Sequence, residues 1–333
     1  MVGLAPDPAA NLHGIPVTNA PTPPVLAFPA LAGMAYPRLD AGHLVRVVAE
    51  PAAIPELPRD DRLAVRVLMT SATRGCSAAV ADALPNLGLV ISQGVGQDRI
   101  DLPVLASRGV RVRSVGEALT EDVADLAMAL VQMIARNLVR ADAFARSGEW
   151  KRGRFAVGES LVGKTMGIAG LSGRIGQALA RRALASGMTL AGIRRPSNQR
   201  FDVPLYESWR ELAGASDVLV LAVPGTPELK HMIGAAELAA LGPKGRLVNV
   251  GRGELVETAA LIDALENGRI AGAALDVVEG EPDVPPRLAA LPNVILTPHI
   301  GAQTWGARAR GAAIAEDEVL AFLRGAPAGA RSS

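Results

Sequence analysis

The chain has 333 residues, of which 49% are hydrophobic and 20% charged, with a net charge of +1. This length exceeds what one hydrophobic core usually serves, so we expect two domains. The near-neutral charge without a polybasic run argues against a nucleic-acid partner or an anionic membrane partner, and no apolar run is long enough for a membrane helix.

A single cysteine, Cys76, excludes an internal disulfide framework and a thiolate metal site, and we expect no bound metal. Residues 1–23 are rich in proline, alanine and asparagine without periodicity, so we expect them to form a poorly ordered leader. They lack a basic stretch followed by an apolar block, which is the pattern of a secretion signal. We therefore expect a cytoplasmic location.

Short apolar runs alternate with amphipathic segments such as 77–84 from residue 24 onward, and each run predicts a strand. The first series of predicted strands comprises residues 25–28, 44–48, 63–70 and 87–92. A long helix is predicted at 119–138, with Thr120 as its cap and acidic residues in its first turn. The second series of strands comprises residues 164–170, 189–193, 217–223, 245–250, 272–277 and 293–298.

A last helix is predicted at 305–323, and the basic segment 147–155 between the two series is expected to be a loop or an arm. Strands that alternate with helices indicate parallel sheets with helices on their faces. We therefore predict an α/β fold with two doubly wound parallel-sheet domains.

A glycine-rich loop follows the strand predicted at 164–170. Its glycines, Gly170, Gly173 and Gly176, are spaced G-x-x-G-x-x-G, one residue wider than the dinucleotide fingerprint G-x-G-x-x-G. Ser172 is the extra residue, and its hydroxyl either donates to a phosphate or only widens the turn. Because a strand precedes the loop and an amphipathic helix follows it, we interpret the loop as a pyrophosphate site at a helix N-terminus.

The next strand of this series ends at Arg194. An NAD-preferring site carries Asp or Glu near this point to accept hydrogen bonds from the ribose, whereas this chain has Arg194, Arg195 and Ser197. Guanidinium groups bind a phosphate through charge-assisted, forked hydrogen bonds. We therefore expect NADP(H) as the preferred cofactor and NAD(H) as the second choice. The alternative is that the two arginines form a solvated surface pair.

Three chemically active side chains each follow a predicted strand in the second half of the chain. Arg252 lies in V-N-V-G-R-G-E, Glu281 in D-V-V-E-G-E-P and His299 in I-L-T-P-H-I-G-A. Ligands of open α/β sheets bind at the carboxyl ends of the strands, so the three can converge on one crevice. We interpret Arg252 as the cation that holds a carboxylate, His299 as a proton donor and Glu281 as the partner that favours the imidazolium. Another histidine, His231, is expected to begin a helix.

Further motifs complete a consistent pattern. They are G-V-G-Q-D-R-I-D (94–101), L-T-E-D-V-A-D-L-A (119–127), V-P-G-T-P-E (223–228), N-V-G-R-G (249–253), A-L-D-V-V-E-G-E-P (274–282) and P-H-I-G (298–301). With the glycine-rich loop, these motifs resemble the D-2-hydroxyacid dehydrogenase family. The segments G-E-W-K-R-G-R-F and R-R-P-S are similar to its NADPH-dependent glyoxylate/hydroxypyruvate reductase branch.

The resemblance implies the same roles for Arg252, Glu281 and His299, and substrate-carboxylate binding by the backbone N–H groups of Val95 and Gly96. It also implies that Asp276 and the Val223–Pro224 turn line the nicotinamide and adenosine sides of the cofactor. The expected cofactor-binding residues are Gly170, Ser172, Gly173, Arg174, Ile175, Gly176, Arg194, Arg195, Ser197, Val223, Pro224, Thr226, Val250, Gly251, Asp276 and Gly301.

The resemblance further implies a Rossmann nucleotide domain, 117–302, inserted in a flavodoxin-like substrate domain made of 24–116 and 303–333. It implies a homodimer built through the nucleotide domain. We predict an oxidoreductase that transfers a hydride from NADPH to a small 2-keto acid of the glyoxylate or hydroxypyruvate type, giving the D-2-hydroxy acid.

Three alternatives remain at this stage. The first is a reductase of a bulkier keto acid, of the hydroxyphenylpyruvate or 2-ketogluconate type. The second is a dinucleotide-sensing, corepressor-like binding protein, and the third is a formate-type dehydrogenase. The intact trio of Arg252, Glu281 and His299 argues against the binding protein. A formate-type dehydrogenase is disfavoured because it would have Gln in place of Glu281.

Overall fold

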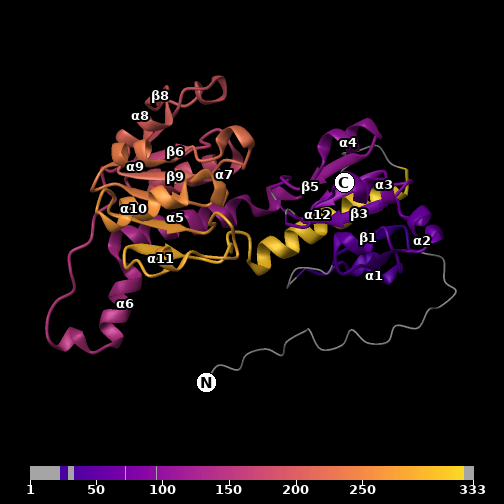
Figure 1. The fold of residues 1–333 in the computed structure, drawn as a ribbon, viewed down its shortest axis with the longest axis horizontal. Helices are drawn as coiled ribbons and strands as arrows, with labels where there is room; N and C mark the ends of the chain where they lie inside the picture. Colours follow the sequence, from indigo (N-terminus) through magenta and orange to yellow (C-terminus); the bar gives the residue numbers. More distant parts are fainter. Residues whose placement is uncertain (1–22, 29–33, 72, 95, 326–333) are drawn as a thin grey trace.

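The computed structural model describes residues 23–28, 34–71, 73–94 and 96–325. Two parallel β-sheets, each covered by helices, form two lobes (Figure 1). This arrangement confirms the predicted α/β fold with two doubly wound parallel-sheet domains. The predicted leader, 1–23, lies outside the described residues except at its last position. Within the described ranges, no helix combines the length and apolarity needed to cross a bilayer.

The first sheet has five parallel strands in the order β2-β1-β3-β4-β5. They are β1 (Val25–Ala27), β2 (Val45–Val47), β3 (Val67–Thr70), β4 (Leu89–Ser92) and β5 (Arg111–Ser114). The three central strands are buried on both faces, as expected for a parallel sheet covered on two sides. The 2-1-3-4-5 order is that of flavodoxin-like sheets, which bind ligands beyond the carboxyl ends of their strands.

Helices cover both faces of the first sheet. The short ones are α1 (Pro37–Ala41), α2 (Arg59–Ala64), α3 (Ala78–Ala83) and α4 (Leu102–Ser107). The long C-terminal helix α12 (Trp305–Leu323), whose bounds match the prediction, contacts β4 and α1. It buries Ala312, Ala315 and Val319 against the apolar residues of β1, β3 and β4. Helix α12 thus completes the first lobe.

The second sheet has seven parallel strands in the order β12-β11-β10-β9-β6-β7-β8. They are β6 (Thr165–Ala169), β7 (Thr189–Ile193), β8 (Leu205–Tyr206), β9 (Val218–Leu221), β10 (Arg246–Asn249), β11 (Gly272–Leu275) and β12 (Val294–Leu296). The order reverses between β6 and β9, as in Rossmann sheets, which bind dinucleotides beyond the carboxyl ends of their strands at that point.

The second sheet is also covered on both faces. Helices α5 (Thr120–Arg136) and α7 (Arg174–Ala185) pack on one face, and α8 (Trp209–Gly214), α9 (Ala235–Leu241) and α10 (Thr258–Glu266) on the other. The short α11 (Pro286–Ala289) contacts β12. Successive strand residues face opposite cores: Ile168 packs with α5 and α7, and Ala169 with the other helices.

The chain passes between the lobes twice, through the 3-10 helix η2 (Gly116–Leu119) into α5 and again into α12 (Figure 1). The predicted cap at Thr120 is wrong. Because η2 runs directly into α5, Thr120 is already helical, and its hydroxyl donates to the Gly116 carbonyl at 3.4 Å.

The two crossings are joined at Asp122 on α5. This carboxylate accepts hydrogen bonds from Thr304, which caps α12, and from Arg310 on α12. Arg310 also donates to the Ala118 carbonyl at 3.0 and 3.2 Å. The two helices that enter opposite lobes therefore share one polar junction. The predicted domain boundaries at 116/117 and 302/303 fall close to it and stay a prediction.

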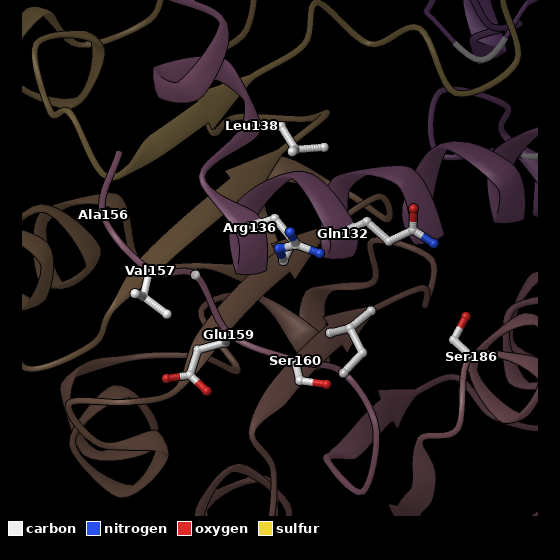
Figure 2. Close-up of a pocket in the computed structure, with 10 residues that line it drawn as sticks. Gln132, Arg136, Leu138, Ala156, Val157, Glu159, Ser160 and Ser186 are labelled. Atoms are coloured by element: carbon white, nitrogen blue, oxygen red, sulfur yellow. The ribbon is translucent and has the colours of Figure 1, made fainter. Parts of the chain in front are cut away.

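After α5 an arm, residues 137–161, leaves the second lobe (Figure 1). It starts with α6 (Leu138–Arg146), which buries none of its residues, and continues through the 3-10 helix η3 (Glu149–Lys151). Where residues 156–161 rejoin the end of α5, they border a cavity of about 660 Å³ (Figure 2). Gln132 and Arg136 of α5 line its other side.

Candidate active site

Arg252 follows β10 in a turn that is shaped by Asn249, the last residue of the strand. The buried Asn249 side chain donates to the Arg252 carbonyl at 2.8 Å and accepts from the Gly251 N–H at 3.0 Å. A Cβ added at Gly253 would lie 2.1 Å from the carbonyl carbon of Val278. The absence of a side chain at Gly253 thus lets the Arg252 turn pack directly against the turn that follows β11.

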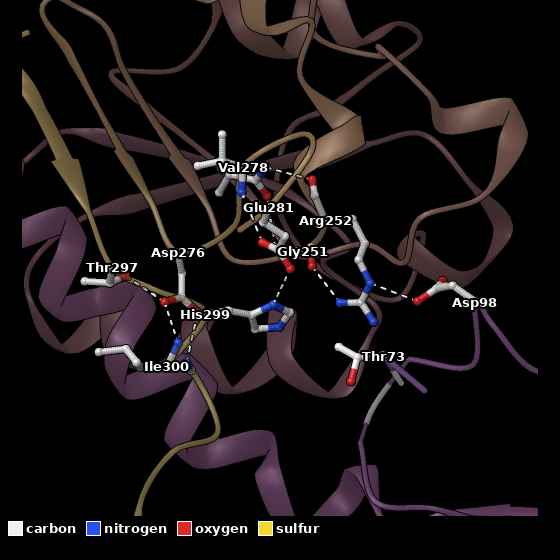
Figure 3. A network of polar contacts seen from close by, with 12 residues as sticks. Thr73, Asp98, Gly251, Arg252, Asp276, Val278, Glu281, Thr297, His299 and Ile300 are labelled. Carbon is white, nitrogen blue, oxygen red and sulfur yellow. Dashed lines mark hydrogen bonds and ion pairs between the residues drawn. The ribbon is translucent and has the colours of Figure 1, made fainter. Parts of the chain in front are cut away.

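The guanidinium of Arg252 reaches the first lobe (Figure 3). Its Nε donates to Oδ2 of Asp98 at 2.9 Å, and its Nη1 donates to the Gly251 carbonyl at 2.7 Å. Its Nη2 lies against the backbone of Gly96, where an added Cβ would be only 1.7 Å away. The structure therefore brings Gly96 to Arg252, whereas Val95 lies outside the described residues.

His299 forms a hydrogen-bonded pair with Glu281 (Figure 3). The ring Nδ1 lies 2.6 Å from Oε1 of Glu281, and the Val278 N–H donates to Oε2 at 3.3 Å. Both side chains are about half exposed, with 45% of His299 and 38% of Glu281 accessible. Figure 3 shows the imidazole, the carboxylate and the Arg252 guanidinium gathered at one place between the lobes.

The pair shifts both pKa values toward the charged forms. The hydrogen bond with Glu281 raises the pKa of His299 above its ordinary value, although partial burial and the nearby Arg252 act to lower it. Burial alone would raise the pKa of Glu281, but His299, the Val278 N–H and Arg252 outweigh burial and hold that pKa below its ordinary value. The site therefore favours an imidazolium beside a carboxylate.

Asp276 anchors the loop that carries His299. Its side chain is buried, and Oδ1 accepts hydrogen bonds from the Thr297 hydroxyl at 2.6 Å and the Ile300 N–H at 2.8 Å. Oδ2 accepts from the Gly301 N–H at 2.9 Å. These contacts hold His299 in a left-handed conformation with φ of 52°. The predicted place of Asp276 beside the nicotinamide stays a prediction.

The glycine-rich loop leads into α7 in the geometry of a phosphate cradle. Gly170 has φ of 100°, and an added Cβ there would lie 2.5 Å from the Ala222 carbonyl oxygen. A Cβ at Gly176 would lie 2.0 Å from the Gly170 carbonyl oxygen, and Gly173 is the residue that precedes α7. The first N–H groups of α7, from Arg174 and Ile175, have no acceptor within the helix. The loop therefore fits a pyrophosphate.

Ser172 connects this loop to the turn after β7. Its hydroxyl donates to the Ser197 hydroxyl at 3.0 Å, and its carbonyl accepts from the Gln177 side chain at 2.8 Å. The inserted serine thus does more than widen the turn, because it joins the carboxyl ends of β6 and β7.

Both arginines after β7 lie at the same edge. Arg194 pairs with Glu207 at 2.5 Å and donates to the Leu205 carbonyl at 3.1 Å. The Arg195 guanidinium lies 5.7 Å from the centre of the Trp209 ring. Both arginines line a cavity of about 390 Å³ with Glu207 and Trp209.

The remaining predicted cofactor residues follow strands of the same sheet. Val223, Pro224 and Thr226 come after β9, Val250 and Gly251 after β10, and Gly301 after β12. The first two turns interlock, because a Cβ at Gly251 would lie 2.7 Å from the Val223 carbonyl oxygen. Every predicted cofactor residue thus lies at or just beyond a carboxyl end of the second sheet.

Sequence reasoning missed two residues and misplaced one. Asp98 and Asn249 lie within recognised motifs, but only the structure shows that they bind Arg252. Asp98 accepts from its guanidinium, and the Asn249 side chain donates to its backbone carbonyl. The prediction that His231 begins a helix is wrong, because it lies in a turn with φ of 54° and α9 begins only at Ala235.

A Rossmann sheet with a phosphate cradle, facing an arginine and a histidine–carboxylate pair, defines a nicotinamide-dependent oxidoreductase. Residues 128–301 match the family model described as "D-isomer specific 2-hydroxyacid dehydrogenase, NAD binding domain". The chain belongs to the D-isomer specific 2-hydroxyacid dehydrogenase family, as the resemblance indicated. It is an enzyme that acts on the CH–OH group of 2-hydroxy acids or on the corresponding keto acids.

Relatives and solved structures agree on the family over most of the chain. A glyoxylate reductase of Thermococcus gammatolerans is 42% identical over 81% of this chain and 84% of its own. A hydroxyphenylpyruvate reductase of Plectranthus scutellarioides is 41% identical over 79% and 84%. The NADPH-dependent glyoxylate/hydroxypyruvate reductase of Sinorhizobium meliloti, solved with NADP and malonate, is 37% identical with a TM-score of 0.80, covering 90% of this chain and 93% of that one.

Proposed function

We propose that the enzyme reduces a small 2-keto acid of the glyoxylate or hydroxypyruvate type with NADPH and releases the D-2-hydroxy acid. The observation that carries the proposal is the gathering of Arg252 and the Glu281–His299 pair at the carboxyl ends of the second sheet (Figure 3). A cation and a loaded acid at one place are what a keto acid needs when its carbonyl becomes an alkoxide.

Arg252 binds the substrate in this proposal. Asp98 holds Nε and the Gly251 carbonyl holds Nη1, so the guanidinium plane is fixed while Nη2 lies beside Gly96. A carboxylate at this point would accept from Nη2 and from the backbone N–H groups of Gly96 and Val95. The same positive charge polarises the neighbouring carbonyl.

His299 supplies the proton. Glu281 keeps the imidazole charged and fixes it through Nδ1, which leaves Nε2 as the atom that donates to the carbonyl oxygen. A nicotinamide bound at the second sheet would supply the hydride. The acid and Arg252 thus stabilise the same developing negative charge from two directions.

The residues at the second sheet fit a dinucleotide. The turn at Gly170 and Gly176 lets a pyrophosphate approach the N-terminus of α7. Arg194 and Arg195 support NADPH over NADH, because their guanidiniums suit the 2′-phosphate and residues 194–200, directly after β7, include no Asp or Glu. The Sinorhizobium meliloti relative, named as NADPH-dependent and solved with NADP, supports the same choice.

A bulkier keto acid is the second candidate. It is favoured by the relatives named hydroxyphenylpyruvate reductase, at 41% identity, and 2-ketogluconate reductase from Gluconobacter oxydans, at 40% identity. All these substrates share the 2-keto carboxylate that Arg252 and His299 would bind, and they differ only in the group beyond it.

The test is a substrate panel followed by the absorbance of the reduced nicotinamide. Glyoxylate, hydroxypyruvate, hydroxyphenylpyruvate and 2-ketogluconate are each assayed with NADPH and with NADH. We expect the highest kcat/KM for one of the first two, with NADPH preferred at least about tenfold, the effect of about one lost charge-assisted contact. A higher kcat/KM for one of the larger acids would select the second candidate. No turnover of any of them would contradict both.

We further propose the homodimer expected from the sequence, built through the arm of the nucleotide domain. The arm exposes Leu138 by 44%, Val139 by 51%, Trp150 by 70% and Val157 by 96%. Several large apolar side chains exposed on one segment of the chain favour an interface there. Light scattering should give twice the chain mass, and Trp150→Ser with Val157→Ser should reduce it to one. The cytoplasmic location stays a prediction.

A further inference from the structure

The turn after β11, residues 276–283, carries two glutamates, and each binds a histidine. This segment is named the 276–283 loop. Glu281 lies 2.6 Å from Nδ1 of His299, and Glu279 lies 2.7 Å from Nε2 of His231. Both histidines have a left-handed backbone, with φ of 52° and 54°. Only the first of these pairs has a place in the proposed chemistry.

Glu279 is held at both of its oxygens. Oε1 meets His231, which precedes α9, and Oε2 accepts from the hydroxyl of Thr258, the first residue of α10, at 3.0 Å. The side chains are partly buried, with 37% of His231 and 30% of Glu279 exposed. Burial alone would raise the pKa of Glu279, but the hydrogen bonds from His231 and Thr258 outweigh it and hold that pKa below its ordinary value. The carboxylate is therefore a charged, two-point anchor.

The backbone of the 276–283 loop is also closely packed against the Arg252 turn. A Cβ at Gly253 would lie 2.1 Å from the carbonyl carbon of Val278 and 2.3 Å from the N atom of Glu279. The Arg252 turn and the contacts of Glu279 therefore restrain the same loop. Without the Glu279 side chain, packing against Gly253 remains, but the bonds from Thr258 and His231 to the loop are lost.

Two supports of His299 come from this one loop. Asp276 holds the backbone around His299, whose N–H donates to the Asp276 carbonyl at 2.9 Å, and Glu281 holds its ring. A shift of the loop would therefore move both supports together. A misplacement of about 1 Å at a reacting group costs up to about 100-fold in rate.

We propose that His231 and Glu279 are a positioning pair, which fixes the 276–283 loop so that Glu281 stays at hydrogen-bond distance from His299. Neither residue touches substrate or cofactor in this role. The strained backbone of His231 is consistent with it, because the left-handed conformation aims the ring at Glu279 and costs free energy that the contact offsets.

The test measures the titration of the His299 ring by NMR in the protein without ligands, together with steady-state kinetics and thermal unfolding. The groups that face His299 are Glu281, Asp276 and Arg252, and none of them is altered. The variants are Glu279→Ala, Glu279→Gln and His231→Asn. Asn tolerates a left-handed backbone but is too short to replace the ring, which separates the contact from the strain. The control is Glu266→Ala, which removes the exposed ion pair with Arg287 at 2.7 Å.

In Glu279→Ala, we expect the pKa of His299 to fall toward its ordinary value, because Glu281 is no longer held against the ring. We expect kcat for the keto acid to fall about tenfold or more, with cofactor KM little changed. Glu279→Gln should retain most of kcat, since its amide oxygen can accept from one partner while its NH2 donates to the other, and His231→Asn should fall between them. Glu266→Ala should match the wild type.

An unchanged His299 titration in folded Glu279→Ala would overturn the proposal, and so would a lower melting temperature with unchanged kcat, which marks a purely structural contact. The kinetic measurements rest on the proposed function, whereas the titration of His299 does not. If the wild type reduces no keto acid, the proposed function fails while the titration still decides the role of His231 and Glu279.

Discussion

Gly96→Ala tests the predicted substrate site at its tightest point. The added Cβ would lie 1.7 Å from Nη2 of Arg252 and 2.6 Å from Oδ2 of Asp98, whereas ordinary contacts begin near 3.4 Å. The guanidinium must therefore withdraw by 3.4 − 1.7 = 1.7 Å from the place where a carboxylate is expected. A displacement of about 1 Å costs about 100-fold, so we expect kcat/KM for the keto acid to fall by at least that factor, about 2.7 kcal/mol in the transition state.

The same substitution should leave the fold nearly unchanged. The clash falls on the end of a flexible side chain, and the Arg252–Asp98 ion pair that it disturbs is worth only about 1 kcal/mol at a partly exposed site. The melting temperature should stay within about 3 °C of the wild type. Gly153→Ala is the matched control, because a Cβ at Gly153 meets no atom within 4 Å.

Kinetics with the preferred keto acid, thermal unfolding and cofactor titration are compared for the two variants and the wild type. We expect Gly96→Ala to bind the cofactor normally and to lose turnover at low keto-acid concentration. A kcat/KM within about threefold of the wild type, which is below about 0.7 kcal/mol, would refute the placement of the substrate carboxylate beside Gly96 and Nη2 of Arg252.

Other predictions concern charges at the site. Glu281→Gln removes the group that raises the pKa of His299, so the loss of reductase activity with rising pH should begin at lower pH than in the wild type; coincident pH profiles would contradict this. Arg252→Ala should reduce kcat/KM by about 1,000-fold or more while cofactor fluorescence titrations stay normal, and loss of cofactor binding would argue for a different role. Arg194→Asp should shift the ratio of kcat/KM values toward NADH by about tenfold or more, and an unchanged ratio would show that Arg194 does not face the 2′-phosphate.

The sequence predicts those elements of the fold whose apolar pattern is strong. The helix at 305–323 and the central strands of both sheets occur where expected, because their apolar residues are buried on a regular period. The edge strand β5 was missed because its sequence R-V-R-S alternates with arginines and it is only half buried. The edge strand β8 was missed because it is two residues long.

The predictions for Thr120 and His231 were wrong because another segment of the chain decides the local conformation at each. Thr120 has the chemistry of a cap, but a preceding 3-10 helix supplies the start of α5. His231 stands before a helical sequence, yet its contact with Glu279, 48 positions later, sets its geometry. Neither outcome follows from the residues near these positions.

Part of the candidate site could also be predicted from the sequence, and part could not. Arg252, Glu281 and His299 could be predicted because each follows an apolar strand, and carboxyl ends of parallel strands meet at one edge. The Arg252–Asp98 contact joins residues 154 positions apart and on different sheets. Such a pairing depends on how the two lobes are oriented, and the sequence pattern contains no information about that orientation.

The junction at Asp122 has a consequence for how a substrate enters. Both covalent connections between the lobes pass this carboxylate, so we expect any opening of the molecule to be a rotation about it rather than a sliding motion. Rotation about this junction would leave it intact and would separate Arg252 from Asp98, which lie on different lobes. An open molecule would thus hold Arg252, the proposed substrate-binding residue, loosely, and closing would stiffen it.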